Sequence, residues 1–159
     1  MKIKENDMLP EVNFFYLTNN GPKSISTSEL FKNKKILLVG VPGAFTPTCS
    51  LEHLPGFIEN KSIFYSKGID KIIFVSVNDP FVISEWAKSK NETDIQFIGD
   101  PNGDFVKQTG LIIDLSVIGL GTRLSRFAMV VDNMRISLLL DEDGGDLKLS
   151  AAEKVLESI

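Results

Sequence analysis

The sequence predicts an α/β protein with a mixed central sheet flanked by helices, and three observations support this prediction. Apolar runs of strand length alternate with segments that carry helix start signals. Two apolar runs near the C-terminus flank a short polar turn, which is typical of an antiparallel hairpin. A helical segment then closes the chain, and this order of elements is typical of a layered α/β sandwich.

The predicted strands are short apolar runs bounded by turn residues. Those at residues 35–41 and 72–77 are almost wholly apolar, which indicates central strands buried on both faces. The others lie at residues 12–17, 95–98, 127–131 and 136–140. An Asn-Asn-Gly-Pro turn at residues 19–22 ends the first strand, and Asp132 and Asn133 join the last two.

The predicted helices lie at residues 26–31, 47–67, 80–90 and 100–110, and after Ser150. Asp79 is the expected N-cap of the third helix, with a proline at its first position. The Pro55-Gly56 pair interrupts the second helix and predicts a kink or an irregular turn there. Ser150 and Glu153 have the spacing of a capping box, which predicts the start of the final helix.

Length, charge and composition exclude several classes of protein. The 159 residues suit one domain spanning residues 1–159, because neither a linker nor an internal repeat divides them. The net charge is −4 and basic residues form no cluster, so we expect no nucleic-acid partner. No apolar run approaches ~20 residues, the length that spans a bilayer, so we expect no membrane segment. The N-terminus lacks a signal or transit pattern, which predicts a cytoplasmic protein or an organellar one whose presequence was removed.

Cys49 is the only cysteine of the chain, so no internal disulfide can form. One cysteine and one histidine also fall short of a structural zinc site, and we expect neither a metal nor another cofactor. Thr46 is a good N-cap and Pro47 suits the first helical position, which places Cys49 in the first turn of a helix. Unpaired backbone N–H groups and the helix dipole favour a nucleophilic thiolate there. A lone cysteine is also commonly a small buried apolar residue, and the residues alone leave both interpretations open.

Four segments carry a resemblance to a known family. The first is PGAFTPTC, in which Pro42, Thr46 and Cys49 form a Pro-Thr-Cys pattern. The others are HLPGF, SVNDPFV and LGTRLSRFAMVVDN, which begin at residues 53, 76 and 120. Together they resemble the type II (peroxiredoxin-five-like) branch of the peroxiredoxin family. The resemblance extends from about residue 12 to residue 159, which is nearly the whole chain.

The resemblance implies a thioredoxin-like fold and a thiol peroxidase that reduces hydrogen peroxide and alkyl hydroperoxides in antioxidant defence. It also implies that Cys49 is the peroxidatic cysteine and that Thr46, Pro42 and Arg126 complete the active site. In this chemistry the thiolate attacks a peroxide oxygen and becomes a sulfenic acid. Hydrogen-bond donors around the leaving oxygen stabilise the charge that develops on it.

Several of these residues have plainer roles available. One alternative is that Thr46 is simply an N-cap with no part in catalysis. Another is that Arg123 and Arg126 are both solvated. The resemblance assigns the active-site role to Arg126, which directly precedes an apolar strand and can project inward. His53, four residues after the cysteine, has the spacing of a Cys-His pair, but its segment is structural in the resembling family. The acidic run at residues 141–146 lacks EF-hand spacing, so we expect a solvated loop.

The chain departs from those type II members that carry a second, resolving cysteine. Phe74 and Leu149 occupy the aligned positions, and neither side chain can attack a sulfenic acid. The predicted mechanism therefore needs an external thiol as reductant: glutathione, glutaredoxin or thioredoxin. The family commonly forms dimers through loops that flank the active site, so we expect a homodimer with Phe45, Val117 and Ile118 as candidate contact residues.

Two other classes of function stay open. A redox sensor or holdase would pass the oxidation of Cys49 to a partner protein. A thioredoxin-like interaction module would not need the thiol at all. The intact set of Pro42, Thr46, Cys49 and Arg126 favours the peroxidase.

Overall fold

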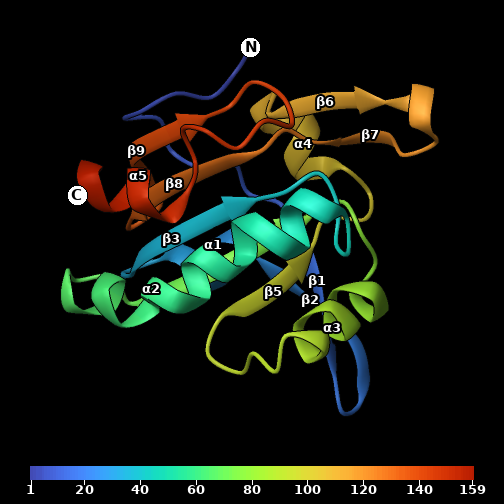
Figure 1. Ribbon diagram of the computed structural model, residues 1–159, viewed down its shortest axis with the longest axis horizontal. Helices are drawn as coiled ribbons and strands as arrows, with labels where there is room; N and C mark the ends of the chain where they lie inside the picture. Colours follow the sequence, from blue (N-terminus) through green and yellow to red (C-terminus); the bar gives the residue numbers. More distant parts are fainter.

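The computed structural model describes residues 1–159 and confirms the predicted mixed sheet with helices on both sides (Figure 1). Seven strands form the sheet in the order β2-β1-β5-β4-β3-β8-β9. Their bounds are Asn13–Thr18 (β1), Gly21–Ser26 (β2), Lys35–Gly40 (β3), Lys71–Ser76 (β4), Gln96–Gly99 (β5), Phe127–Asp132 (β8) and Arg135–Asp141 (β9). The central strands β3, β4 and β5 are parallel, and all other neighbours in the sheet pair antiparallel. The carboxyl ends of the parallel strands therefore share one edge, where α/β proteins commonly place functional residues.

Helices cover both faces of this sheet. Their bounds are Thr27–Phe31 (α1), Leu54–Ser66 (α2), Pro80–Ser89 (α3), Asp104–Thr109 (α4) and Ala152–Ser158 (α5). The buried apolar residues of α2, α3 and α5 belong to one apolar cluster, and those of α1 and α4 belong to another. A separate hairpin of β6 (Ile112–Leu115) and β7 (Gly121–Leu124) projects beyond the sheet, with a 3-10 turn at Ser116–Ile118 between its strands (Figure 1).

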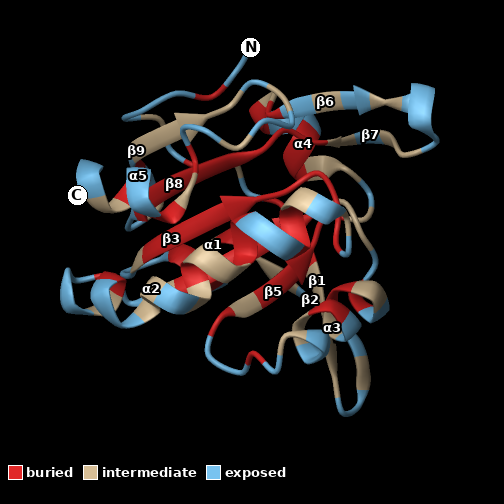
Figure 2. Ribbon diagram, in the orientation of Figure 1, coloured by how far each residue is buried: buried red, intermediate tan, exposed pale blue.

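The alternation of side chains along the central strands produces the two apolar clusters. In β3, Leu37 and Val39 join the cluster under α2, whereas Ile36 and Leu38 join the cluster on the opposite face. All four side chains are completely buried. Figure 2 shows the same burial along β3 and β8. The strands predicted as central are thus almost wholly apolar because both of their faces are covered.

Local capping signals account for the start of two helices, and of these the Asp79 cap was predicted. Ser26 and Glu29 form a complete capping box at α1. At α3, Asp79 Oδ1 accepts hydrogen bonds from the backbone N–H groups of Phe81 and Val82, at 2.8 and 2.9 Å.

Asp79→Ala is expected to lower the free energy of unfolding by about 1 kcal/mol, because the first turn of α3 loses both of these hydrogen bonds. Urea unfolding followed by far-UV circular dichroism measures the change. Glu59→Ala, at an exposed position of α2, is the control and is expected to stay within about 0.5 kcal/mol of wild type. An unchanged unfolding midpoint for Asp79→Ala would show that α3 does not depend on its side-chain cap.

Four features of the secondary structure differ from the prediction. Strand β2 and the β6–β7 hairpin were not expected, because they bury few side chains and lack long apolar runs. The fourth helix begins only at Asp104, because the buried Asp100 carboxylate lies before the helix and accepts hydrogen bonds from the first-turn N–H groups of Phe105 and Val106. Ser150 does not cap the final helix, since its amide and hydroxyl both donate to Glu142.

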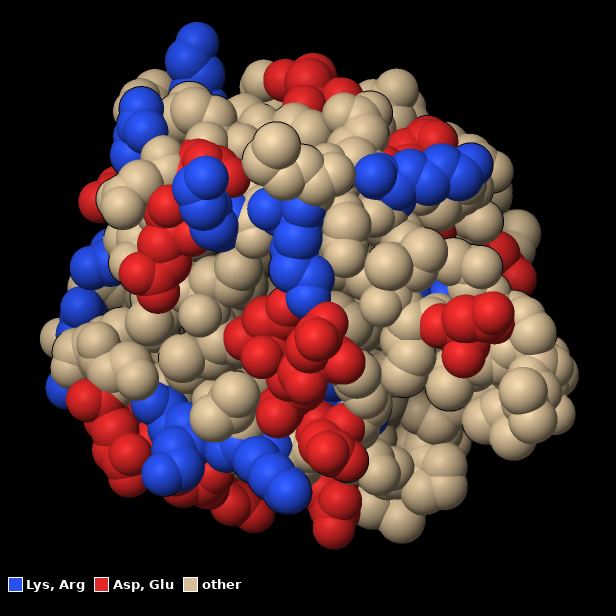
Figure 3. Space-filling model, turned by 90° about the horizontal axis from the view of Figure 1, so that it is seen from above, with Lys and Arg blue, Asp and Glu red and all other residues tan.

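The surface carries charges of both signs. On the face shown in Figure 3, Lys and Arg side chains lie among Asp and Glu side chains, in keeping with the net charge of −4. None of the helices combines the length and apolar character needed to cross a bilayer.

Candidate active site

Cys49 lies in the first turn of the long helical segment that follows β3. This segment begins at Pro47, and the carbonyl of Thr46 accepts a hydrogen bond from the N–H of Ser50 at 2.9 Å. Residues Cys49–His53 then form a π-helical turn before α2 begins. An irregular turn was predicted at Pro55 and is found directly before it, because proline has no N–H to donate to an α-helical ladder.

Arg126 contacts the thiol directly. Its Nη2 lies 3.1 Å from Cys49 Sγ, and the two residues are 2% and 0% exposed. Arg126 directly precedes β8, and β8 pairs with β3, whose carboxyl end leads to the Cys49 turn. Strand pairing thus brings together two residues that are 77 positions apart in the sequence.

The other nitrogens of the Arg126 guanidinium are also engaged. Nη1 donates to Nδ1 of His53 at 2.9 Å, and Nε donates to the carbonyl of Gly145 at 3.1 Å. The backbone N–H of Arg126 donates to the carbonyl of Gly144 at 2.7 Å. The guanidinium is therefore fixed with Nη2 directed at the sulfur.

His53 is a neutral acceptor for Arg126 in this structure. Its Nδ1 accepts a hydrogen bond from Arg126, so the imidazole proton lies on Nε2. The Nε2–H group donates a hydrogen bond to the carbonyl of Ser150 at 2.9 Å. Burial, reinforced by the charge of Arg126, lowers the pKa of His53 from 6.5 to about 3. His53 forms no hydrogen bond with the sulfur, and an imidazole of such low basicity is a poor general base at neutral pH.

His53 is expected to make the fold less stable as the pH falls. The unfolded chain protonates this imidazole near pH 6.5, whereas the folded protein, in which the pKa is lowered to about 3, protonates it only near that pH. The unfolded state binds more protons in this window, so stability is full above pH 6.5 and is lost as the pH falls toward 3. Between about pH 7 and about pH 4.5, His53 is expected to lower the free energy of unfolding by about 2–3 kcal/mol.

Urea unfolding of the wild type and of His53→Asn, repeated across that window, isolates this contribution, because the carboxylates are common to both proteins. The difference in unfolding free energy between the two proteins should shrink as the pH falls. A difference that does not change with pH would contradict a neutral, buried His53.

The loop before Cys49 carries the other two predicted site residues. The Thr46 hydroxyl donates to the carbonyl of Gly43 at 2.7 Å and forms no hydrogen bond with the sulfur. It accepts no N–H group of the helix either, so the predicted side-chain cap at Thr46 is wrong. The carbonyl of Pro42 accepts a hydrogen bond from Nη1 of Arg123 at 3.2 Å. Phe45 has a φ of 65°, an uncommon backbone conformation for an aromatic residue and one that is often retained at functional sites.

A residue outside the predicted site also holds this loop. Asn78 Oδ1, at the start of the α3 connection, accepts the backbone N–H of Ala44 at 3.0 Å and the hydroxyl of Ser76 at 2.8 Å. The SVNDPFV segment that contains Asn78 was the available signal. Arg123 is thus a loop anchor, and Arg126 is the arginine that reaches the sulfur.

Comparisons with known proteins agree with this arrangement. The family model described as Redoxin matches residues 4–156. The chain is 41% identical over 155 residues to Peroxiredoxin-2D of Arabidopsis thaliana, covering 96% of each chain. The chain belongs to the peroxiredoxin family. It is therefore a thiol peroxidase.

Two solved structures place this peroxiredoxin within the family. Reduced Prx3 from Vibrio vulnificus in complex with H2O2 is 38% identical, with a TM-score of 0.93 over 98% of each chain. The 1-Cys peroxiredoxin antioxidant protein of Plasmodium falciparum is 33% identical, with a TM-score of 0.91 over 98% of each chain. The thioredoxin-like fold and the single-cysteine type II assignment are confirmed.

Of the two positions that align with resolving cysteines, one is buried and the other is exposed. Phe74 is completely buried and packs against Phe97 with ring centroids 5.8 Å apart. Leu149 is exposed near the start of α5. Neither position holds a thiol, and Cys49 is the only sulfur nucleophile of this peroxiredoxin.

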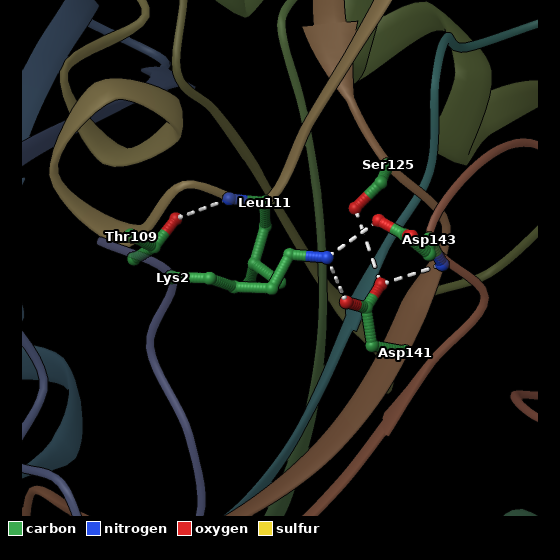
Figure 4. Close-up of polar contacts among 6 residues, drawn as sticks. All are labelled: Lys2, Thr109, Leu111, Ser125, Asp141 and Asp143. Atoms are coloured by element: carbon green, nitrogen blue, oxygen red, sulfur yellow. Dashed lines mark hydrogen bonds and ion pairs between the residues drawn. The ribbon is translucent and has the colours of Figure 1, made fainter.

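The acidic run at residues 141–146 is not simply a solvated loop, and that prediction is wrong. The carbonyls of Gly144 and Gly145 accept hydrogen bonds from Arg126, and the N–H of Glu142 donates to the Arg126 carbonyl at 3.0 Å. On the outer side, Lys2 Nζ pairs with Asp141 at 2.8 Å and Asp143 at 2.6 Å (Figure 4). The sequence could not show this role, because every one of these partners is distant in the chain.

Proposed function

We propose that this peroxiredoxin reduces hydrogen peroxide and alkyl hydroperoxides through a sulfenic acid on Cys49, which an external thiol then reduces. The observation that supports this proposal is the 3.1 Å contact between Arg126 Nη2 and Cys49 Sγ in the first turn of a helix. A guanidinium and helix N–H groups both favour the thiolate form of a neighbouring thiol.

In the proposed reaction the thiolate attacks one peroxide oxygen. An S–O bond forms as the O–O bond breaks, and the departing oxygen takes up a proton to leave as water or an alcohol. Arg126 offers N–H donors to the peroxide, and the Thr46 hydroxyl becomes a further donor when it rotates away from Gly43. Pro42 shields the sulfur from bulk water and shapes the preceding loop.

Ionisation of the thiol alone does not make a fast peroxidase. An ordinary thiol with a pKa of ~8.5 is about 3% ionised at pH 7, so complete ionisation raises the thiolate fraction roughly 30-fold, or about 2 kcal/mol. Stabilisation of the leaving oxygen by oriented donors must supply the larger part of the rate.

Peroxide must also reach a sulfur that is completely buried. The residues that cover Cys49 therefore have to move slightly before the substrate can approach. Substrate size then matters, which makes a comparison of hydrogen peroxide with bulkier alkyl hydroperoxides informative.

The sulfenic acid is recycled by an external thiol in this proposal, because no second cysteine exists in the chain. The thiol attacks the sulfenic sulfur and releases water, which leaves a mixed disulfide, and a second thiol then regenerates Cys49. Glutathione, glutaredoxin and thioredoxin are the reductant classes that fit.

A reductant panel tests this proposal. Peroxide consumption is followed with glutathione alone, with glutathione and glutaredoxin, and with a thioredoxin system, and Cys49→Ser serves as the blank. Multiple turnovers with at least one of these systems are expected. A single turnover followed by arrest with all of them would contradict an external-thiol peroxidase.

We also propose a cytoplasmic homodimer that acts in antioxidant defence and redox homeostasis. Phe45, Val117 and Ile118 support the dimer, because they are exposed by 51%, 98% and 67% and lie in the active-site loop and the turn of the β6–β7 hairpin. Sedimentation velocity at micromolar concentration should give the mass of a dimer, and a monomeric mass would contradict it.

A further inference from the structure

Glu142 lies at the head of a chain of hydrogen bonds that ends at the active-site arginine. Its Oε2 accepts the backbone N–H groups of Lys148, Leu149 and Ser150, at 2.8, 2.7 and 2.8 Å. The same oxygen accepts the Ser150 hydroxyl at 2.9 Å. One carboxylate oxygen therefore fixes the backbone of residues 148–150.

The fixed segment presents the Ser150 carbonyl to His53. That carbonyl accepts the imidazole Nε2 proton at 2.9 Å, in a position where His53 is 1% exposed and has no access to water. The lone pair of Nδ1 then faces Arg126 Nη1 at 2.9 Å. A proton moved to Nδ1 would instead set two donors against each other at this distance.

Charge favours the same arrangement. Burial alone would raise the pKa of Glu142, but the hydrogen bonds from Ser150, Lys148 and Leu149 outweigh it and hold that pKa below its ordinary value. The charged groups around His53 are Arg126, which opposes a second positive charge on the imidazole, and Glu142, which favours it less strongly. Nη2 of the same guanidinium donates to Cys49 Sγ. The neutral Nε2–H tautomer of His53 is therefore the form in which Arg126, His53 and Cys49 all have hydrogen-bond partners.

We propose that Glu142 is a positioning residue for the peroxidase reaction: through Ser150 and His53, it holds the Arg126 guanidinium against Cys49 Sγ. The inference rests on the proposed function only for its kinetic consequence. The tautomer of His53 can be measured whether or not the protein turns over peroxide.

The test uses the fact that the chain contains one histidine, so a two-dimensional ¹H–¹⁵N spectrum of the imidazole needs no assignment. Wild-type protein should show a neutral ring protonated on Nε2 at neutral and mildly acidic pH. In Glu142→Ala, the ring should show the Nδ1–H form or titrate nearer to its ordinary range. Glu142→Gln keeps an oxygen acceptor and should fall between the two. Glu59→Gln, an exposed charge change on α2, is the matched control and should match wild type.

The kinetic readout is the single-turnover rate of sulfenic acid formation. Glu142→Ala should slow it by roughly tenfold to a hundredfold through misplacement of the guanidinium, while Glu142→Gln recovers part of the rate. Thermal unfolding shows whether each variant is folded before its rate is compared.

Two outcomes would overturn the inference. One is a folded Glu142→Ala protein with a wild-type imidazole spectrum and rate. Another needs no variant: a wild-type imidazole that is charged, or protonated on Nδ1, at neutral pH. If the wild-type spectrum is as expected but the protein consumes no peroxide, the proposed function fails and the positioning of Arg126 stands.

Discussion

Cys49→Ser is expected to abolish the reaction with peroxide completely. The chain has no other sulfur nucleophile, and a serine hydroxyl does not ionise near neutral pH and cannot form a sulfenic acid. The substitution changes a single atom in a buried position of the helix, so the fold should be kept. Stopped-flow measurement of peroxide consumption checks the result.

The control for Cys49→Ser is its thermal unfolding curve, which should stay close to that of wild type. Peroxide consumption above the buffer rate in a folded Cys49→Ser protein would mean that another group carries the reaction. It would also reopen the alternative of a thioredoxin-like interaction module that does not need the thiol.

Arg126→Ala is expected to slow sulfenic acid formation by about 10²–10³-fold, or about 3–4 kcal/mol in barrier height, as for removal of an oriented donor to a developing oxyanion. The loss has two sources, since the sulfur loses a cation at 3.1 Å and the peroxide loses its fork of N–H groups. Rapid mixing of reduced protein with a range of hydrogen peroxide concentrations gives the second-order rate constant.

Arg126→Lys separates these two sources. Lysine keeps the positive charge but cannot contact His53, Gly145 and the sulfur at once as the planar guanidinium does. Its rate should lie between those of Arg126→Ala and wild type. Arg135→Ala, on an exposed residue of β9, controls for the loss of a positive charge and should react like wild type. Equal rates for wild type and a folded Arg126→Ala would remove Arg126 from the mechanism.

The elements that could be predicted from sequence are those whose signal is local. The apolar runs of β3 and β4 are buried on both faces, and the Asp79 cap of α3 acts on residues two and three positions away. Strand β2 was missed because it is an edge strand with exposed residues such as Lys23 and Ser24. This strand forms because its backbone pairs with β1. Backbone pairing does not require an apolar pattern, so the sequence of β2 carries no strand signal.

In the candidate site, too, local features could be predicted from sequence and long-range contacts could not. The placement of Cys49 at a helix start could be predicted from Pro47, two residues before it, where the helix begins, although the Thr46 side chain does not cap that helix. Arg126 was selected through the family resemblance, because its contact with the sulfur depends on the pairing of β3 with β8. The acidic loop was misjudged because composition describes its charge and not the carbonyls that bind Arg126. Ser150 has the spacing of a helix cap, but its amide and hydroxyl bind the Glu142 carboxylate, and a spacing pattern does not show that partner.

The most direct test of the account is a single turnover of reduced protein with less than one equivalent of hydrogen peroxide, followed by rapid trapping and peptide mass spectrometry. We expect Cys49 to gain one oxygen as a trappable sulfenic acid, and an added thiol to remove that oxygen and restore the free cysteine. Consumption of peroxide with Cys49 left unmodified, or a Cys49 that stays reduced while peroxide persists, would contradict it.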